Sequence, residues 1–164
     1  MLYIWLISLI FYRYLFFTLE PYDLAPPYWI NMGAMAISTL AGTMLVAAVP
    51  RSLLLQQLLP FLKGFTAFFW ATATWWIPML FILGIWRHVY RRFPLRYDPL
   101  YWGAVFPLGM YAASTQRMTE AMQIDFLGVL PAIFLVLGLL AWFVLFIGQL
   151  RSLRRHWIAS ARTE

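Results

Sequence analysis

Cysteine is absent from the 164-residue chain, and charged residues are scarce, at 11% of the total. Without cysteine there is no disulfide and no thiolate metal ligand. Soluble domains carry roughly 25% charged residues, so a soluble fold is excluded. Acidic residues are fewest, six against twelve Lys and Arg, and the net charge of +6 would suggest nucleic acid in a soluble chain. The arginines instead stand at the ends of apolar runs, so no nucleic-acid partner is expected.

Apolar residues make up 63% of the chain, and its mean hydropathy is +0.75. This is enough for about five membrane spans of ~20 residues each. The long charge-free runs lack the period-two alternation of barrel strands, which predicts an all-α integral membrane protein. We expect a single transmembrane domain over residues 1–164, with spans at about 1–17, 28–49, 64–86, 99–116 and 127–150.

The ends of the apolar runs carry recognisable signals. The first run reaches spanning length only if Arg13 snorkels to the membrane surface, and it lacks the basic start and the cleavage site of a signal peptide. It is therefore predicted to be a helix. Asp98 followed by Pro99 is typical of a helix N-terminus. The leucine-rich segment 51–59 predicts a short interfacial helix.

Basic residues predict the orientation in the membrane. Two clusters should both face the cytoplasm, which an even number of spans between them allows. The C-terminus is then cytoplasmic, and with five spans the N-terminus lies outside, which suggests that a preceding part is missing. Arg51 and Lys63 would face the outside in this arrangement. The clusters are Arg87, Arg91, Arg92 and Arg96, and Arg151, Arg154, Arg155 and Arg162.

The second span is rich in small residues, with Ala34, Ser38 and Gly42 spaced four apart and Gly33 beside them. Small side chains let helices pack closely, and with hydroxyl groups they also leave room for a solute. Both interpretations stay open, since each can hold on a different face.

The fourth span contains Pro107, with Gly103 four residues before it and Gly109 two after. Proline has no N–H to donate to the carbonyl of Gly103, so a kink and a free carbonyl are expected in the middle of the span. At membrane depth that carbonyl needs a neighbouring helix, water or a solute as its partner.

The third and fifth spans are apolar all round and are predicted to be outer helices that face lipid, with Gly138 among the lipid-facing positions. No span contains Asp, Glu, Lys or His, which favours an uncharged path over a proton relay. His88 and His156 have no second ligand at metal spacing, and no nucleophile or paired carboxylates occur. Neither an enzyme nor a cofactor is expected.

Four separated motifs begin at Pro27, Trp75, Gly84 and Tyr97 and read PYWINMGAMAISTLAG, WWIPML, GIWRH and YDPLYWGAVFPLGMY. Together they resemble the tellurite-resistance/dicarboxylate-transporter (TDT) family, which is related to the slow anion channels. The resemblance implies the C-terminal half of a ten-helix pore made of helical hairpins, with inner helices around the pore. It implies a pore wall at Asn31, Gly33, Ser38, Gly42 and Gly109, and the kinked inner helix at Pro107.

Two functions follow as hypotheses. The first is transport of small anions, such as dicarboxylates, tellurite-related oxyanions or sulfite, through a central pore in the plasma (bacterial inner) membrane. The second is a non-transporting membrane fragment or an assembly partner. A half-pore would leave polar groups facing lipid, and each polar group without a hydrogen-bond partner in hydrocarbon costs on the order of several kcal/mol. Besides the lipid bilayer and the anion, we therefore expect a complementary N-terminal half or self-association.

Overall fold

The computed structural model describes residues 2–24, 26–94 and 97–160, so Arg96 and Arg162 of the two basic clusters lie outside the described residues. The described residues form five α-helices and no strand, which confirms the all-α prediction. The helices are α1 (Leu2–Phe16), α2 (Ile30–Ala48), α3 (Leu53–Ile85), α4 (Trp102–Met122) and α5 (Val129–Ser160).

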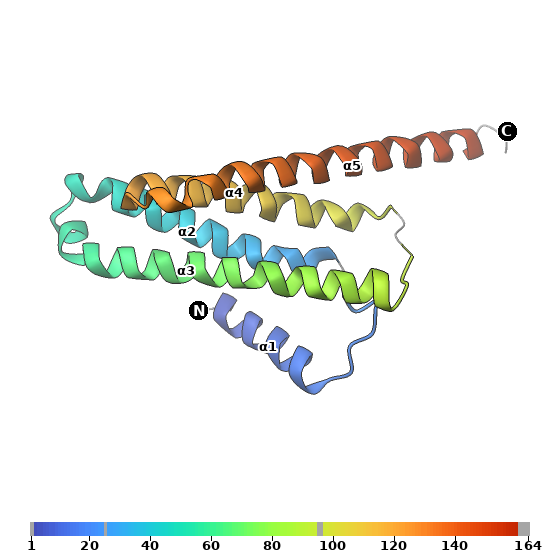
Figure 1. The fold of residues 1–164 in the computed structure, drawn as a ribbon, viewed down its shortest axis with the longest axis horizontal. Helices are drawn as coiled ribbons and strands as arrows, with labels where there is room; N and C mark the ends of the chain where they lie inside the picture. The colour runs from blue at the N-terminus through green and yellow to red at the C-terminus, as the bar shows by residue number, and fades with distance from the viewer. Residues whose placement is uncertain (1, 25, 95–96, 161–164) are drawn as a thin grey trace.

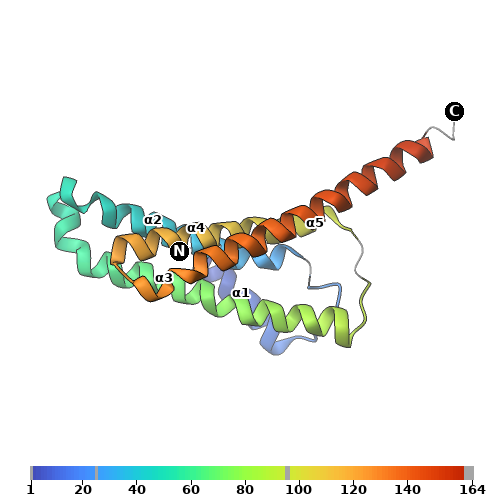
Figure 2. The same cartoon turned by 45° about the horizontal axis from the view of Figure 1, so that its top comes forward.

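Helices α2 to α5 form two antiparallel hairpins, α2–α3 and α4–α5, which lie along the same axis (Figure 1). Helix α2 packs against both α3 and α4, and α4 packs against both α2 and α5. Helices α2 and α4 run parallel and form the inner pair, with α3 and α5 on its flanks (Figures 1 and 2). Helix α1 lies obliquely beside α3, where Phe11 contacts Trp75 and Trp76.

Within the part of the chain that the structure describes, three helical segments are long and apolar enough to cross a membrane: Ile30–Arg51, Leu53–Tyr90 and Asp125–Arg155. With 15 residues at about 1.5 Å each, α1 extends only about 22 Å, less than the ~30 Å of a hydrocarbon core. Helix α4 has the length but is the most polar of the five. The membrane limits of the individual spans stay predictions.

The predicted interfacial helix at 51–59 is wrong. A 3-10 turn at Val49–Arg51 ends at Ser52, whose side chain accepts a hydrogen bond from the Leu55 N–H, and α3 begins directly afterwards at Leu53. The helix continues through Pro60, because a proline removes only one main-chain hydrogen bond and packing elsewhere outweighs the loss. Residues 53–59 are therefore the first two turns of a 33-residue helix.

The N-terminal signal at Asp98 is confirmed. Its Oδ1 accepts a hydrogen bond from the Leu100 N–H at 2.9 Å, and a 3-10 turn at Pro99–Tyr101 leads into α4. Because the α-helix begins at Trp102, Pro107 lies in its second turn rather than in its middle, and the helix continues through it.

Candidate functional site: the inner helix pair

The α2–α4 contact brings two of the predicted pathway residues together. A Cβ built on Gly33 would lie 3.0 Å from Pro107 Cγ, so the proline ring fills the space that a side chain on Gly33 would occupy. Both residues are buried. Because Gly33 has no side chain, α2 and α4 cross closely at the rigid Pro107 ring. At Gly33 the small residue therefore serves close helix packing.

Gly42 makes a different contact, toward α3. A Cβ there would lie 2.1 Å from Thr66 Oγ1, a separation that no real side chain shows. Thr66 is buried and its hydroxyl donates to the carbonyl of Leu62 at 2.7 Å. Gly42 therefore lets α2 and α3 approach closely at the far end of the hairpin from Gly33.

Polar side chains join the helices on this covered side. Trp70 Nε1 on α3 donates to Thr115 Oγ1 on α4 at 3.0 Å. The Thr74 hydroxyl donates to the Trp70 carbonyl, so the Tyr111 hydroxyl, 2.8 Å away, donates to Thr74. The Tyr111 ring also contacts Phe134 of α5 with a centroid distance of 4.5 Å, so three helices meet at this side chain.

The opposite side of the pair is uncovered. The buried residues of α2 and α4 recur with the helical period and face each other, α3 and α5, which leaves one exposed stripe on each helix. Gly109 lies on this stripe, and a Cβ there would meet nothing within 4 Å. We call the two stripes together the open face: Ala34, Ile37, Ser38, Ala41 and Leu45 on α2, and Phe106, Gly109, Ala113, Gln116 and Glu120 on α4.

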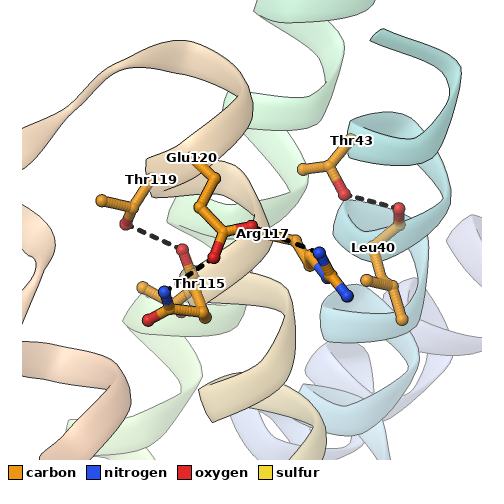
Figure 3. A network of polar contacts seen from close by, with 7 residues as sticks. Leu40, Thr43, Thr115, Arg117, Thr119 and Glu120 are labelled. Atoms are coloured by element: carbon orange, nitrogen blue, oxygen red, sulfur yellow. Dashed lines mark hydrogen bonds and ion pairs between the residues drawn. The ribbon is translucent and has the colours of Figure 1, made fainter. Parts of the chain in front are cut away.

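A groove between the two helices adjoins the open face, with which it shares Glu120. It is lined by Leu40, Thr43, Met44 and Ala47 of α2 and by Arg117, Glu120 and Ala121 of α4, with a volume of about 620 Å³. Figure 3 shows Arg117 projecting from α4 toward Leu40 and Thr43. Glu120 pairs with Arg117 at 3.3 Å and accepts a hydrogen bond from Gln116 at 2.8 Å, so the charges at this end compensate one another.

Hydroxyl groups on α2 use their protons within the helix. Ser38 donates to the carbonyl of Ala34 at 3.0 Å, and Thr39 and Thr43 donate to the carbonyls of Met35 and Leu40. This is how a polar side chain is satisfied in an apolar surrounding. An anion needs hydrogen-bond donors, so in this conformation Ser38 offers an oxygen and some space rather than a proton.

The remaining predicted residues lie apart from these contacts. Asn31 is half-buried and, with Arg13 and Ala34, lines a hollow between α1 and α2. Gly103 is half-buried in the first turn of α4. The structure thus brings Gly33 and Pro107 together, holds Gly42 against α3, and leaves Gly109 on the open face.

The sequence predicted that Gly138 faces lipid, and this prediction is wrong. Gly138 is buried in the α4–α5 contact, where an added Cβ would lie 3.5 Å from the Gly109 main-chain nitrogen and 3.6 Å from Leu108 Cβ. A run of apolar residues does not show which position faces the neighbouring helix, so the small residue was the only available signal. The rest of α5 is largely exposed, as expected of an outer helix.

Comparison with known proteins decides the family. The family model for voltage-dependent anion channels (SLAC1) matches residues 1–150. The chain belongs to this family. It is accordingly a membrane protein of a family of anion channels and transporters.

Relatives of two sizes are similar to the chain. Uncharacterized membrane proteins of two Mycobacterium tuberculosis strains are 38% identical over 154 residues, which cover 93% of this chain and 77% of theirs. An uncharacterized transporter of Methanocaldococcus jannaschii is 29% identical over 130 residues, 77% of this chain but 36% of its own. No solved structure gives a significant match.

Proposed function

We propose that the chain supplies part of the wall of a pathway for small anions, with the open face of α2 and α4 lining that pathway. The observation that carries the proposal is that the two inner helices are covered by α3 and α5 on one side only. The other side carries small and polar residues, including Gly109, Ala113 and Gln116, beside the larger apolar Ile37, Leu45 and Phe106.

The chemistry of the open face favours passage without a fixed-charge binding site. The open-face residues of α2, and those of α4 as far as Ala113, are uncharged. The Ser38 hydroxyl already donates its proton to its own helix. Selection among anions would then depend on the size of the pore and on the arginines at the ends of the helices, which raise the local anion concentration. Dicarboxylates, tellurite-related oxyanions and sulfite are the substrate classes we propose.

Completion of the pathway requires further helices. Gln116, Arg117 and Glu120 are exposed on α4, and in a bilayer exposed polar groups cost several kcal/mol each unless protein or water covers them, on the order of a lost hydrogen bond or more. A complementary set of helices or a second copy of the chain would enclose them. The match to only 36% of the longer transporter supports the first arrangement, and the mycobacterial relatives, matched over 77% of their length, support the second.

Cysteine accessibility tests the proposal directly, because the chain has no native cysteine. Ala113→Cys on the open face and Ala132→Cys on the exposed surface of α5 form a matched pair. In membrane-embedded protein, a water-soluble anionic thiol reagent should modify Ala113→Cys, since the pathway holds water. It should spare Ala132→Cys, which faces lipid. Equal reactivity of the two variants would refute the open face as a pathway.

The second candidate function, a non-transporting assembly partner, also leaves the open face covered. It differs in what an anion does: sulfite or malate should slow the labelling of Ala113→Cys in a pathway and should have no effect in a protein interface.

Reporters fused after Glu164 and inserted between Arg92 and Pro94 test the proposed orientation in the plasma membrane. Both should report the cytoplasm, and one at Thr119 the opposite side.

A further inference from the structure

A buried arginine lies at the end of α3, away from the open face. Arg87 exposes only 8% of its surface, although the sequence placed it in a basic cluster facing the cytoplasm. It lies in a π-helical turn, Trp86–Tyr90, a distortion that occurs often at functional sites. After this turn Arg92 adopts a left-handed conformation with φ of 50°, and the chain folds back over the arginine.

The guanidinium is held on one edge and on one face. Nη1 donates to the carbonyl of Leu24, in the segment between α1 and α2, and the Phe93 ring lies 4.4 Å from Cζ. Nε is buried and has no hydrogen-bond partner among the described residues. Nε lies on the edge of the guanidinium that does not face Leu24, and this is an edge with which arginine binds carboxylate or phosphate.

No carboxylate neutralises this charge within the described residues. The two ion pairs there join Arg13 to Asp23 and Arg117 to Glu120. The neighbouring His88 offers no proton to an anion in this cavity. Its Nδ1 donates to the Phe93 carbonyl at 3.0 Å, which leaves Nε2 without a proton in the neutral ring. A buried, unpaired cation is costly, so an anion from outside the chain is the expected partner.

The cavity beside Arg87 shows what kind of anion fits. It has a volume of about 510 Å³ and extends from Arg87 and His88 between α3, α4 and α5. Its walls are almost entirely apolar and include Leu80, two helical turns before Arg87 on α3, with Leu108 of α4 and Leu137 and Ala141 of α5. A small hydrated anion gains nothing from such walls, whereas an acyl chain does.

We propose that the Arg87 cavity binds a phospholipid with an anionic headgroup, with the phosphate on the Nε–Nη2 edge and part of an acyl chain along the apolar walls. Basic pockets between membrane helices near the cytoplasmic surface are suited to such headgroups. The site lies apart from the open face and does not depend on anion passage. It would anchor the end of α3 and the start of α4 to the α1–α2 segment through a single bound lipid.

Native mass spectrometry of the full chain in a nonionic detergent tests the proposal with phosphatidylglycerol and phosphatidylcholine as probes. The wild type should retain one phosphatidylglycerol at least about fivefold more strongly than phosphatidylcholine, since only the former carries net charge for the guanidinium. Arg87→Gln should abolish that preference. Arg91→Gln removes an exposed arginine that stacks on Trp86 outside the cavity, and should preserve it. Loss of the preference in both variants, or in neither, would overturn the site.

A cavity-filling pair covers the case in which Arg87→Gln fails to fold. Ala141→Phe fills part of the cavity that Ala141 lines and should remove the bound lipid, whereas Leu139→Phe on the exposed side of α5 should not. Inorganic phosphate distinguishes a free anion from a lipid. If phosphate stabilises the wild type and Ala141→Phe equally against heat, and lipid stabilises neither, the cavity takes a free oxyanion and the lipid proposal is wrong.

Discussion

Small residues occur on both the covered side and the open face of the inner pair, but for different reasons. On the covered side, Gly33 and Gly42 are small because Pro107 and Thr66 occupy the adjacent space. On the open face, a Cβ added to Gly109 would meet nothing within 4 Å. A small residue in a membrane helix therefore identifies close packing or a free surface only after its neighbours are known, and substitution should separate the two cases.

The largest expected effect is at Gly42. Gly42→Leu places a Cβ 2.1 Å from Thr66 Oγ1, a contact that the helices must separate to relieve. Overpacking costs typically ~1–3 kcal/mol, and we expect the upper end of that range in the free energy of unfolding, measured by denaturant titration in detergent. Gly42→Leu combined with Thr66→Ala should recover part of the loss. If Gly42→Leu is as stable as the wild type, the α2–α3 contact is not as close as described.

A smaller effect is expected at the α2–α4 crossing. Gly33→Ala brings a methyl group to 3.0 Å from Pro107 Cγ, and the cost should be about 1 kcal/mol because the ring has little freedom to move. Pro107→Ala removes the ring and restores an N–H for the Gly103 carbonyl. A double-mutant cycle of unfolding free energies should therefore show coupling between the two positions. Strict additivity would mean that they do not touch.

The smallest effect on stability is expected for the polar link on the covered side. Trp70→Phe keeps most of the ring but removes the donor to Thr115, and a neutral hydrogen bond contributes about 1 kcal/mol. Thr115→Val removes the acceptor. The two single variants and the double variant should lose similar amounts in thermal unfolding, since each breaks the same bond. A double variant that loses the full sum would place the destabilisation elsewhere.

Local signals in the sequence were enough for the helices but not for their neighbours. Charge-free runs gave five helices, and Asp98 with Pro99 gave the entry to α4, because both depend on residues close in the chain. The separate helix at 51–59 was wrong, since a leucine-rich composition does not show that packing carries the helix on through Pro60.

The site shows the same division. Gly33 and Pro107 were both selected from the sequence, but no local pattern says that they touch. Gly138 was assigned to lipid although it packs against α4. Arg87 looked like any cytoplasmic arginine, because the carbonyl that binds it belongs to Leu24, 63 residues earlier. Contacts of this kind follow from the way the hairpins pack and have no signature in the residues themselves.

Flux per folded molecule tests the central claim, that the open face lines the pathway, most directly. Ala113→Leu on α4 and Ala132→Leu on α5 add the same bulk at exposed positions, so neither should alter the stability of the chain by more than about 0.5 kcal/mol. In proteoliposomes containing the complete assembly, Ala113→Leu should reduce uptake of radiolabelled malate or sulfite at least about tenfold, because a hydrophobic constriction closes a narrow pore. Ala132→Leu should leave uptake unchanged. Equal uptake by the two variants would show that α2 and α4 line no pathway.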